Sequence, residues 1–190
     1  MNILIDLMGS TFIGGMVFLL IFKLNIYSSN QRFASDSELQ LQQNAKTQAE
    51  ILNYDLRKIG FECDSTSIAV ADSEKITFYS DIDRNGSVDV VTYFVNKDPV
   101  LTSGTTNPHD VILCRVVNSD TLIGPSLGLV RLKFSYLDEK SVPTLVISDI
   151  NFIRAELWLE TSEPIETIFT SPLNPYPFTY WEMTINPRNI

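Results

Sequence analysis

The sequence has few of the residues on which most metal sites and hydrolytic mechanisms depend. Its 190 residues include one histidine, His109, and two cysteines, Cys63 and Cys114. A tetrahedral zinc site needs four ligands, mostly nitrogen or sulfur, and the Ser-His-Asp and Cys-His mechanisms need a suitably placed histidine. We therefore expect no enzyme, no small-molecule substrate and no zinc cofactor.

The other candidates for acid–base chemistry show no site pattern. His109 stands beside Asp110 in a proline-containing stretch, where we expect an exposed side chain. The glutamates of the C-terminal half are spread over predicted strands and loops, so we interpret them as solvated rather than as a glycosidase pair: Glu156, Glu160, Glu163, Glu166 and Glu182.

Positive charge is also scarce. Lysine and arginine together number 14, against 23 aspartates and glutamates, so the formal net charge is -9. Binding to a phosphate backbone depends on a basic surface. We therefore expect no nucleic-acid partner.

What the sequence does have is a strongly apolar N-terminus. Between residues 7 and 22 there is no charge, and the only charged side chains before Arg32 are Asp6 and Lys23. Sixteen residues form about 24 Å of helix, and residues 3–26 about 36 Å, against a hydrocarbon core of about 30 Å. We predict a transmembrane helix over residues 1–27.

Two other kinds of segment share this apolar composition. A cleaved signal peptide would have a basic region before the apolar run and small residues at a cleavage site after it, and neither is present. A buried helix of a soluble core would need a large apolar partner surface, which the remaining amphipathic segments do not offer. The membrane helix is the favoured interpretation.

The helical pattern continues beyond the apolar segment. Residues 28–59 contain no glycine or proline, and one narrow apolar stripe recurs every three or four residues. The stripe comprises Leu41, Ala45, Ala49, Leu52, Leu56 and Ile59. Gly60 suits the position just past a helix C-terminus. We predict that the helix continues over residues 28–60 outside the membrane.

Residues 61–190 read as a β-rich head. Segments rich in β-branched and aromatic residues are separated by turn signals, without room for crossover helices, so the sheet is expected to be mainly antiparallel. The predicted strands are 75–80, 88–95, 111–117, 128–137, 152–160 and 180–185. The fold class is therefore α+β, with the long N-terminal helix packed on an antiparallel β head.

Three local patterns resemble the type IV pilin and type II secretion pseudopilin superfamily. Residues 3–7, Ile-Leu-Ile-Asp-Leu, are similar to the hydrophobic start of the mature family chain, with Asp6 in the place of a glutamate. Residues 48–63 resemble the end of the long helix in minor pilins, and residues 75–95 resemble their first hairpin. Met1 and Asn2 stand where the family has the glycine that ends its leader, so either the chain continues upstream or it is not processed in the usual way.

The resemblance implies a structural role. A minor pilin or pseudopilin would be held in the inner membrane by one span, with its head in the periplasm or outside the cell. Its partners would be other pilin-like subunits and an inner-membrane assembly platform. The alternative is a single-span protein whose β-rich periplasmic head binds a ligand and does not polymerise.

Two features of the anchor bear on assembly. In the family, the acid matching Asp6 pairs with the N-terminal amine of a neighbouring subunit; alternatively, lipid headgroups solvate Asp6 and the helix dipole favours it. Gly14 with Ser10, and Gly15 with Thr11, place small residues four apart, which permits close helix approach.

A possible calcium loop lies in the first predicted hairpin. Asp81, Asp83, Asn85, Gly86 and Asp89 follow the pattern D-x-D-x-N-G-x-x-D, which resembles the first three-quarters of a calcium-binding loop. The twelfth position is threonine and a strand follows, so a complete EF-hand is excluded. The alternative, slightly favoured, is a turn shaped by Asp, Asn and Gly alone.

The two cysteines are candidates for a disulfide if the head lies outside the cytoplasm. Cys63 follows the helix and Cys114 falls in a predicted strand, so a bond would close a loop of about 50 residues and stabilise the head by about 3 to 4 kcal/mol. The alternative is two separate buried thiols.

Overall fold

The computed structural model describes residues 3–63, 67–102, 105–165 and 174–190. The chain divides into two compact units, Met1–Ser37 and Glu38–Ile190. The elements are α1 (Ile3–Leu56), β1 (Ile68–Ala71), β2 (Lys75–Ser80), β3 (Asp89–Asn96), α2 (Pro99–Thr102), β4 (Ile112–Val117), β5 (Asp120–Ile123), β6 (Leu129–Leu137), a 3-10 turn η1 (Ile147–Asp149), β7 (Phe152–Glu160) and β8 (Phe178–Ile185).

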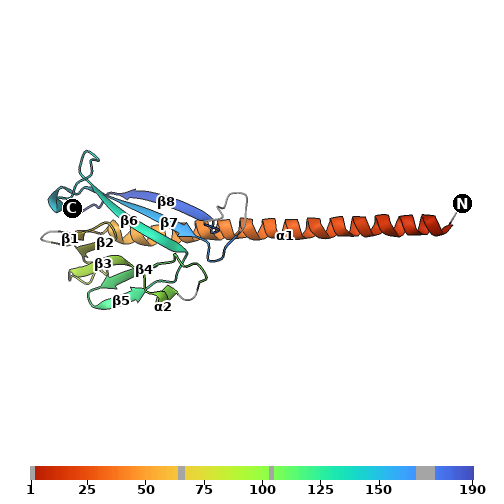
Figure 1. Ribbon diagram of the computed structural model, residues 1–190. Coiled ribbons are helices and arrows are strands. Elements are labelled where there is room, and N and C mark those ends of the chain that lie inside the picture. Colours follow the sequence, from red (N-terminus) through yellow and green to blue (C-terminus); the bar gives the residue numbers. More distant parts are fainter. Residues whose placement is uncertain (1–2, 64–66, 103–104, 166–173) are drawn as a thin grey trace. The chain divides into compact units, whose positions relative to one another are not determined.

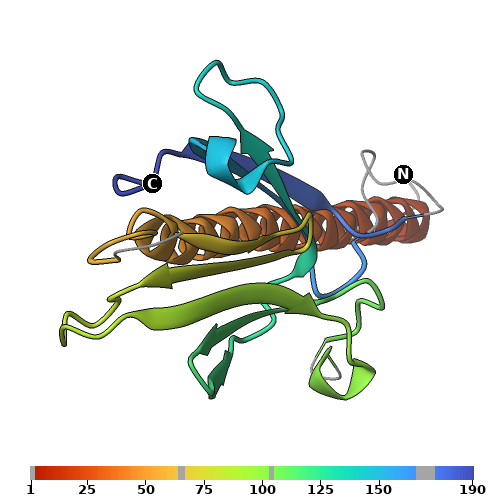
Figure 2. The ribbon, with the colours of Figure 1, turned by 90° about the vertical axis from the view of Figure 1, so that its left-hand side faces the viewer.

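The second unit, which we call the head, consists of two antiparallel sheets around the C-terminal part of α1. Sheet A has the order β1-β2-β3-β4-β5 and sheet B the order β6-β7-β8. Figure 2 shows the two sheets on opposite sides of this part of the helix. The α+β class and the antiparallel pairing are confirmed, whereas the expectation of one sheet is wrong.

The predicted apolar stripe of α1 forms the centre of the core. All six of its residues are buried, and Ala45, Leu52, Leu56 and Ile59 have no exposed surface. They join Phe78 and residues from β3, β6 and β7 in one continuous cluster. Fully burying a leucine or isoleucine stabilises a fold by about 1.5 to 3 kcal/mol, so this stripe supplies much of the driving force that attaches the helix to both sheets.

A glycine with positive φ lies in the turns that follow α1. Gly60 has φ +77°, and its N–H donates to the carbonyl of Tyr79 in β2. A Cβ at this position would lie 2.1 Å from the backbone oxygen of Asn189, so the absence of a side chain lets the C-terminal segment pack against the helix end. The regular helix ends at Leu56, four residues before the predicted Gly60, and the chain continues from there in turns.

The six predicted strands are present with bounds within two residues of those expected. Two strands of four residues, β1 and β5, were not predicted. β5 follows a two-residue turn in which Asn118 has φ +55°. Such short segments give too few alternating positions for a strand to be recognised from sequence.

Candidate functional site

The apolar start of α1 has the properties required of a membrane span. It contains a stretch long and apolar enough to cross a membrane, and none of that stretch is buried. Every residue from 3 to 33 is exposed. The hydroxyl groups of Ser10 and Thr11 donate to carbonyls of the preceding helical turn, which satisfies these polar groups within the helix. The alternative of a helix buried in this chain's own core does not hold for the described residues.

The two residues proposed for assembly lie in this exposed segment. Asp6 is exposed in the first turns of α1, and the structure gives it no ion pair among the described residues. No atom lies within 4 Å of the position that a Cβ on Gly14 would take. Both positions are therefore accessible to a neighbouring helix.

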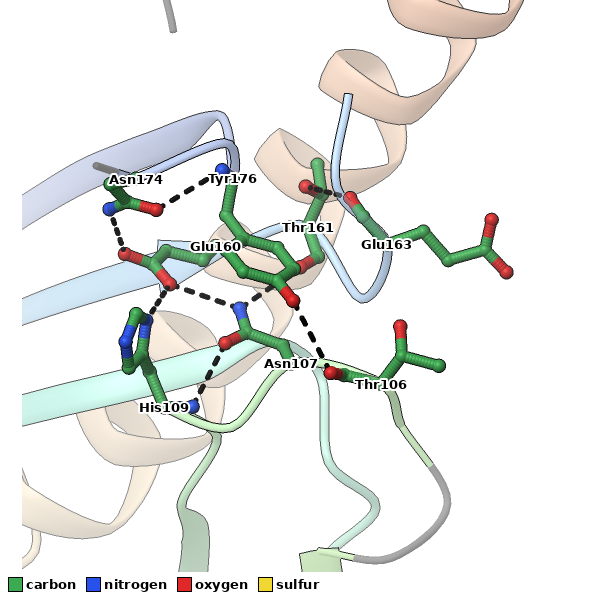
Figure 3. A network of polar contacts seen from close by, with 8 residues as sticks. All are labelled: Thr106, Asn107, His109, Glu160, Thr161, Glu163, Asn174 and Tyr176. Carbon is green, nitrogen blue, oxygen red and sulfur yellow. Dashed lines mark hydrogen bonds and ion pairs between the residues drawn. The ribbon is translucent and has the colours of Figure 1, made fainter. Parts of the chain in front are cut away.

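An extended polar network surrounds the carboxylate of Glu160, at the end of β7 (Figure 3). Its Oε2 accepts from Asn107 Nδ2 at 3.0 Å and lies 2.9 Å from His109 Nδ1, and its Oε1 accepts from Asn174 Nδ2 at 2.9 Å. Glu160 is 7% exposed. Figure 3 shows these side chains converging from the β3–β4 and β7–β8 connections. The Glu160 carboxylate therefore links the β3–β4 connection of sheet A to the β7–β8 connection of sheet B.

Two copies of one short turn hold the donors of this network. In the Asn-Pro-His segment from Asn107, the side-chain oxygen of the asparagine accepts the N–H of His109, two residues on. In the Asn-Pro-Tyr segment from Asn174, the equivalent oxygen accepts the N–H of Tyr176. In both turns the amide nitrogen is left to donate to Glu160. The geometry follows from the preference of asparagine for such turns.

Electrostatics keep Glu160 ionised. Burial alone would raise its pKa, but hydrogen bonds from Asn107, His109 and Asn174 outweigh burial and hold the pKa below the ordinary glutamate value. The nearby carboxyl of Asp110 behaves in the opposite way, since burial raises its pKa and the charge of Glu160 adds to this effect. The Asp110 Oδ2 accepts from Ser126 Oγ, while its Oδ1 has no hydrogen-bond partner among the described residues.

An open cavity of about 530 Å³ lies beside this network. Its wall includes Lys97, Thr105, Thr106, Pro108 and Val130. Hydroxyl groups, one ammonium group and apolar side chains thus surround a space of the size usual for small-ligand sites. Lys97 pairs at 3.2 Å with Glu74, which partly neutralises its charge.

The Asp81 loop has both the closely spaced carboxylates expected of a calcium site and the hydrogen bonds expected of a turn. Carboxylate oxygens of Asp81, Asp83 and Asp89 lie within 4.8 Å of one another, which is close enough for one cation. The same groups already form turn hydrogen bonds: the N–H groups of Asn85 and Gly86 donate to Asp81 at 3.1 and 2.9 Å. Burial raises the pKa of Asp81, but these backbone donors outweigh burial and lower it overall. These hydrogen bonds explain why Asp, Asn and Gly occur in this turn, and calcium binding stays a prediction.

The predicted disulfide is wrong. No bond joins Cys63 to Cys114. Just after the end of β2, the N–H of Asp81 donates to the carbonyl of Phe61, which is two residues before Cys63. At the start of β2, Lys75 pairs with Phe94, and Phe94 pairs with Cys114 on its other side. The two cysteines thus lie near opposite ends of β2, about 17 Å apart at about 3.3 Å per residue, whereas a disulfide needs Cα atoms within about 7 Å.

A second buried polar cluster joins α1 to sheet A. Asp55 Oδ2 accepts from Tyr93 Oη at 2.5 Å and from Arg115 Nε at 2.6 Å. Asp55 is 3% exposed and Tyr93 has no exposed surface. Burial raises the pKa of Tyr93 far above its ordinary value, and the charge of Asp55 raises it further. The phenol therefore stays protonated and donates to the carboxylate.

Comparison of the chain with protein-family models, curated proteins and solved structures gives no match. The functional assignment therefore depends on the chain's own residues.

The interpretation of the C-terminal glutamates as solvated is wrong for Glu160. By strand alternation Glu160 belongs to the outer face of β7 with Glu156, but the two connections cover it. His109 is about half exposed and is nevertheless bonded to Glu160. One sequence signal was available: an Asn-Pro pair followed by an aromatic ring occurs at Asn107 and at Asn174, whereas the third Asn-Pro pair, at Asn186, is followed by arginine.

Proposed function

We propose that this chain is a structural subunit of the minor pilin or pseudopilin kind, anchored in the inner membrane by the apolar start of α1. One observation carries the proposal: a single helix, Ile3–Leu56, is uncovered and apolar at its start and forms the core of an antiparallel β head at its end. The sequence resemblance at residues 3–7, 48–63 and 75–95 supports the same assignment.

The uncovered apolar segment determines how such a subunit would assemble. Such a segment is stable in lipid, and it can leave lipid only if other apolar helices replace the hydrocarbon chains around it. Packing against equivalent helices in a filament meets this condition. The partners are therefore pilin-like subunits with similar N-terminal helices, delivered by an assembly platform in the membrane.

Asp6 gives the proposal a direct test. In a neighbour-paired role, Asp6→Asn keeps the size of the side chain but removes the charge that attracts an amine. The variant should insert in the membrane at least as well as the parent, because an uncharged side chain enters lipid more readily. It should cross-link less to partner subunits and yield fewer filaments, whereas Asp6→Glu should retain both properties.

The matched control is Asp36→Asn, which removes an equally exposed carboxylate from the same unit but outside the apolar segment. It should leave cross-linking and filament yield unchanged. Normal assembly of Asp6→Asn would remove the pairing role of Asp6. Absence of any cross-link between the parent's apolar segment and a pilin-like subunit would overturn the proposed function.

The cavity beside Glu160 favours a second candidate, a single-span anchored head that binds a small ligand and does not polymerise. This candidate needs no contact between the apolar segments of different subunits. The same cross-linking experiment therefore separates the two candidates.

A further inference from the structure

The two sheets of the head have four terminal strands, β1 and β5 in sheet A and β6 and β8 in sheet B. The turn that follows β1 contacts β6, where the N–H of Phe134 donates to the carbonyl of Ser73 at 2.7 Å and the hydroxyl of Tyr136 donates to the carbonyl of Asp72 at 2.9 Å. The two terminal strands that lie away from this contact are β5 and β8. Figures 1 and 2 both place these strands on opposite sides of the head part of α1.

On its outer side, neither β5 nor β8 has a backbone partner among the residues that the structure describes. Within the described part of the chain, the backbone of β8 pairs only with β7 and that of β5 only with β4. A row of unpaired N–H and C=O groups is a template for another strand, and natural edge strands are commonly guarded by short length, charged side chains, proline or a bulge. β5 has four residues and one acidic side chain, Asp120, and β8 has eight residues and one acidic side chain, Glu182. Neither β5 nor β8 contains lysine or proline.

Exposed apolar side chains lie along both edges. In β8, Phe178, Tyr180 and Trp181 are 69, 43 and 37% exposed, and in β5 Leu122 and Ile123 are 58 and 51% exposed. Aromatic and β-branched side chains on neighbouring strands stabilise strand pairing. Each edge thus combines free backbone groups with side chains suited to a partner strand.

β5 and β8 run in opposite directions along the head. The N–H of Gly60 donates to the carbonyl of Tyr79 near the end of β2, so β2 runs toward Gly60. The pairs β2–β3, β3–β4 and β4–β5 are all antiparallel, so β5 runs away from Gly60. β8 runs toward Gly60, because Phe178 pairs with Glu160 at the far end of β7 and Asn189, beyond β8, packs on Gly60. Two heads in the same orientation therefore present β8 and β5 to each other as antiparallel strands.

We propose that the β8 edge of one copy of this chain pairs with the β5 edge of a second copy. This contact joins two different surfaces, so it leaves a free β5 at one end and a free β8 at the other and can repeat. Antiparallel pairing of β8 with β8 would instead use one surface twice and stop at a dimer. The inference rests on the proposed function, to which it adds a specific contact between heads.

The test uses the full chain in membranes, with Cys63→Ser and Cys114→Ala as background. Thr121→Cys on β5 is combined with Thr179→Cys or Thr184→Cys, which lie on opposite faces of β8, and a short bis-maleimide is applied. Mixing the β5 variant with a β8 variant should give cross-linked dimers. A chain that carries both cysteines should give a ladder of higher oligomers, and each single variant alone should stay monomeric.

A charged guard on the edge provides the matched comparison. Leu122→Lys places a lysine on β5, and Leu145→Lys places one at a more exposed leucine, 92% exposed, which lies in the β6–β7 connection and in neither edge strand. Leu122→Lys should lower the yield of mixed dimers about fivefold, equivalent to about 1 kcal/mol, while Leu145→Lys should not. Melting temperatures of the variants verify that the head remains folded.

Several outcomes would overturn the inference. Dimers from a β8 variant alone would show symmetric β8 pairing, and cross-links to a different protein only would show that the partner is not a second copy. Absence of cross-links in every mixture would remove edge pairing altogether. If contacts between apolar segments persist in that case, the proposed function stands and only the head contact fails.

Discussion

Removal of the Asp55 carboxylate should be among the most destabilising single changes in the head. In Asp55→Ala, the Tyr93 hydroxyl, in a fully buried residue, and the Arg115 guanidinium both lose their acceptor. Breaking a buried ion pair by removing one partner costs about 3 to 5 kcal/mol. The Arg115 side chain is 23% exposed and can regain some hydration, so we expect a loss of about 3 kcal/mol.

The assay is urea unfolding of a soluble fragment, residues 28–190, followed by tryptophan fluorescence. Tyr93→Phe keeps the ion pair and should cost only about 1 kcal/mol. The triple replacement Asp55→Leu, Tyr93→Phe, Arg115→Met removes all three polar groups together and should recover most of the stability lost in Asp55→Ala. A loss below about 1 kcal/mol for Asp55→Ala would refute the reasoning, because it would place the cluster in contact with water.

The other predictions concern single positions in the same fragment. Gly128→Ala should cost about 2 kcal/mol or more in urea unfolding, because φ is +80° and the new Cβ would lie 2.3 Å from the carbonyl oxygen of Glu160. Folding lowers the pKa of Glu160 from its ordinary value of 4.5. The stabilisation that the ionised Glu160 contributes is therefore complete above about pH 4.5 and is lost as the pH falls through the folded-state pKa. Glu160→Gln should make the free energy of unfolding depend less on pH in this acid range. The calcium prediction requires that millimolar calcium raise the melting temperature of the parent and not that of Asp83→Ala, and equal melting with and without calcium would leave the loop as a turn. Denatured protein should take up two maleimides without reductant, at Cys63 and Cys114, and uptake of fewer would contradict the separation of the two cysteines.

Most of the secondary structure could be predicted because its signals are local. The stripe from Leu41 to Ile59 repeats at helical spacing over five turns, and β2 was predicted with its observed bounds. The division into two sheets could not be predicted, since antiparallel strands with short connections fit one sheet as well as two. The division arises because β6 pairs with β7 and not with β5, and this choice of partner depends on contacts between residues distant in sequence.

The candidate sites divide in the same way. The Asp81 loop was visible because all of its ligands lie within nine residues, and its geometry repeats the spacing of its sequence. The Glu160 network brings together residues 51 to 53 positions before Glu160 and 14 positions after it. Strand alternation predicted an exposed Glu160, and only the packing of the two connections reverses this. Burial created by connections between strands has no periodic signal in a sequence.

The core of the head begins at Leu41, well after the apolar segment has ended near Tyr27. The residues between them, 28–40, form part of α1, yet none is buried. Helices of about 13 residues without a buried face are only marginally stable in water on their own. If this stretch unwinds, its length can grow from about 20 Å to about 43 Å, at about 1.5 and 3.3 Å per residue. Such lengthening would break no contact of the buried core, because the core begins only at Leu41.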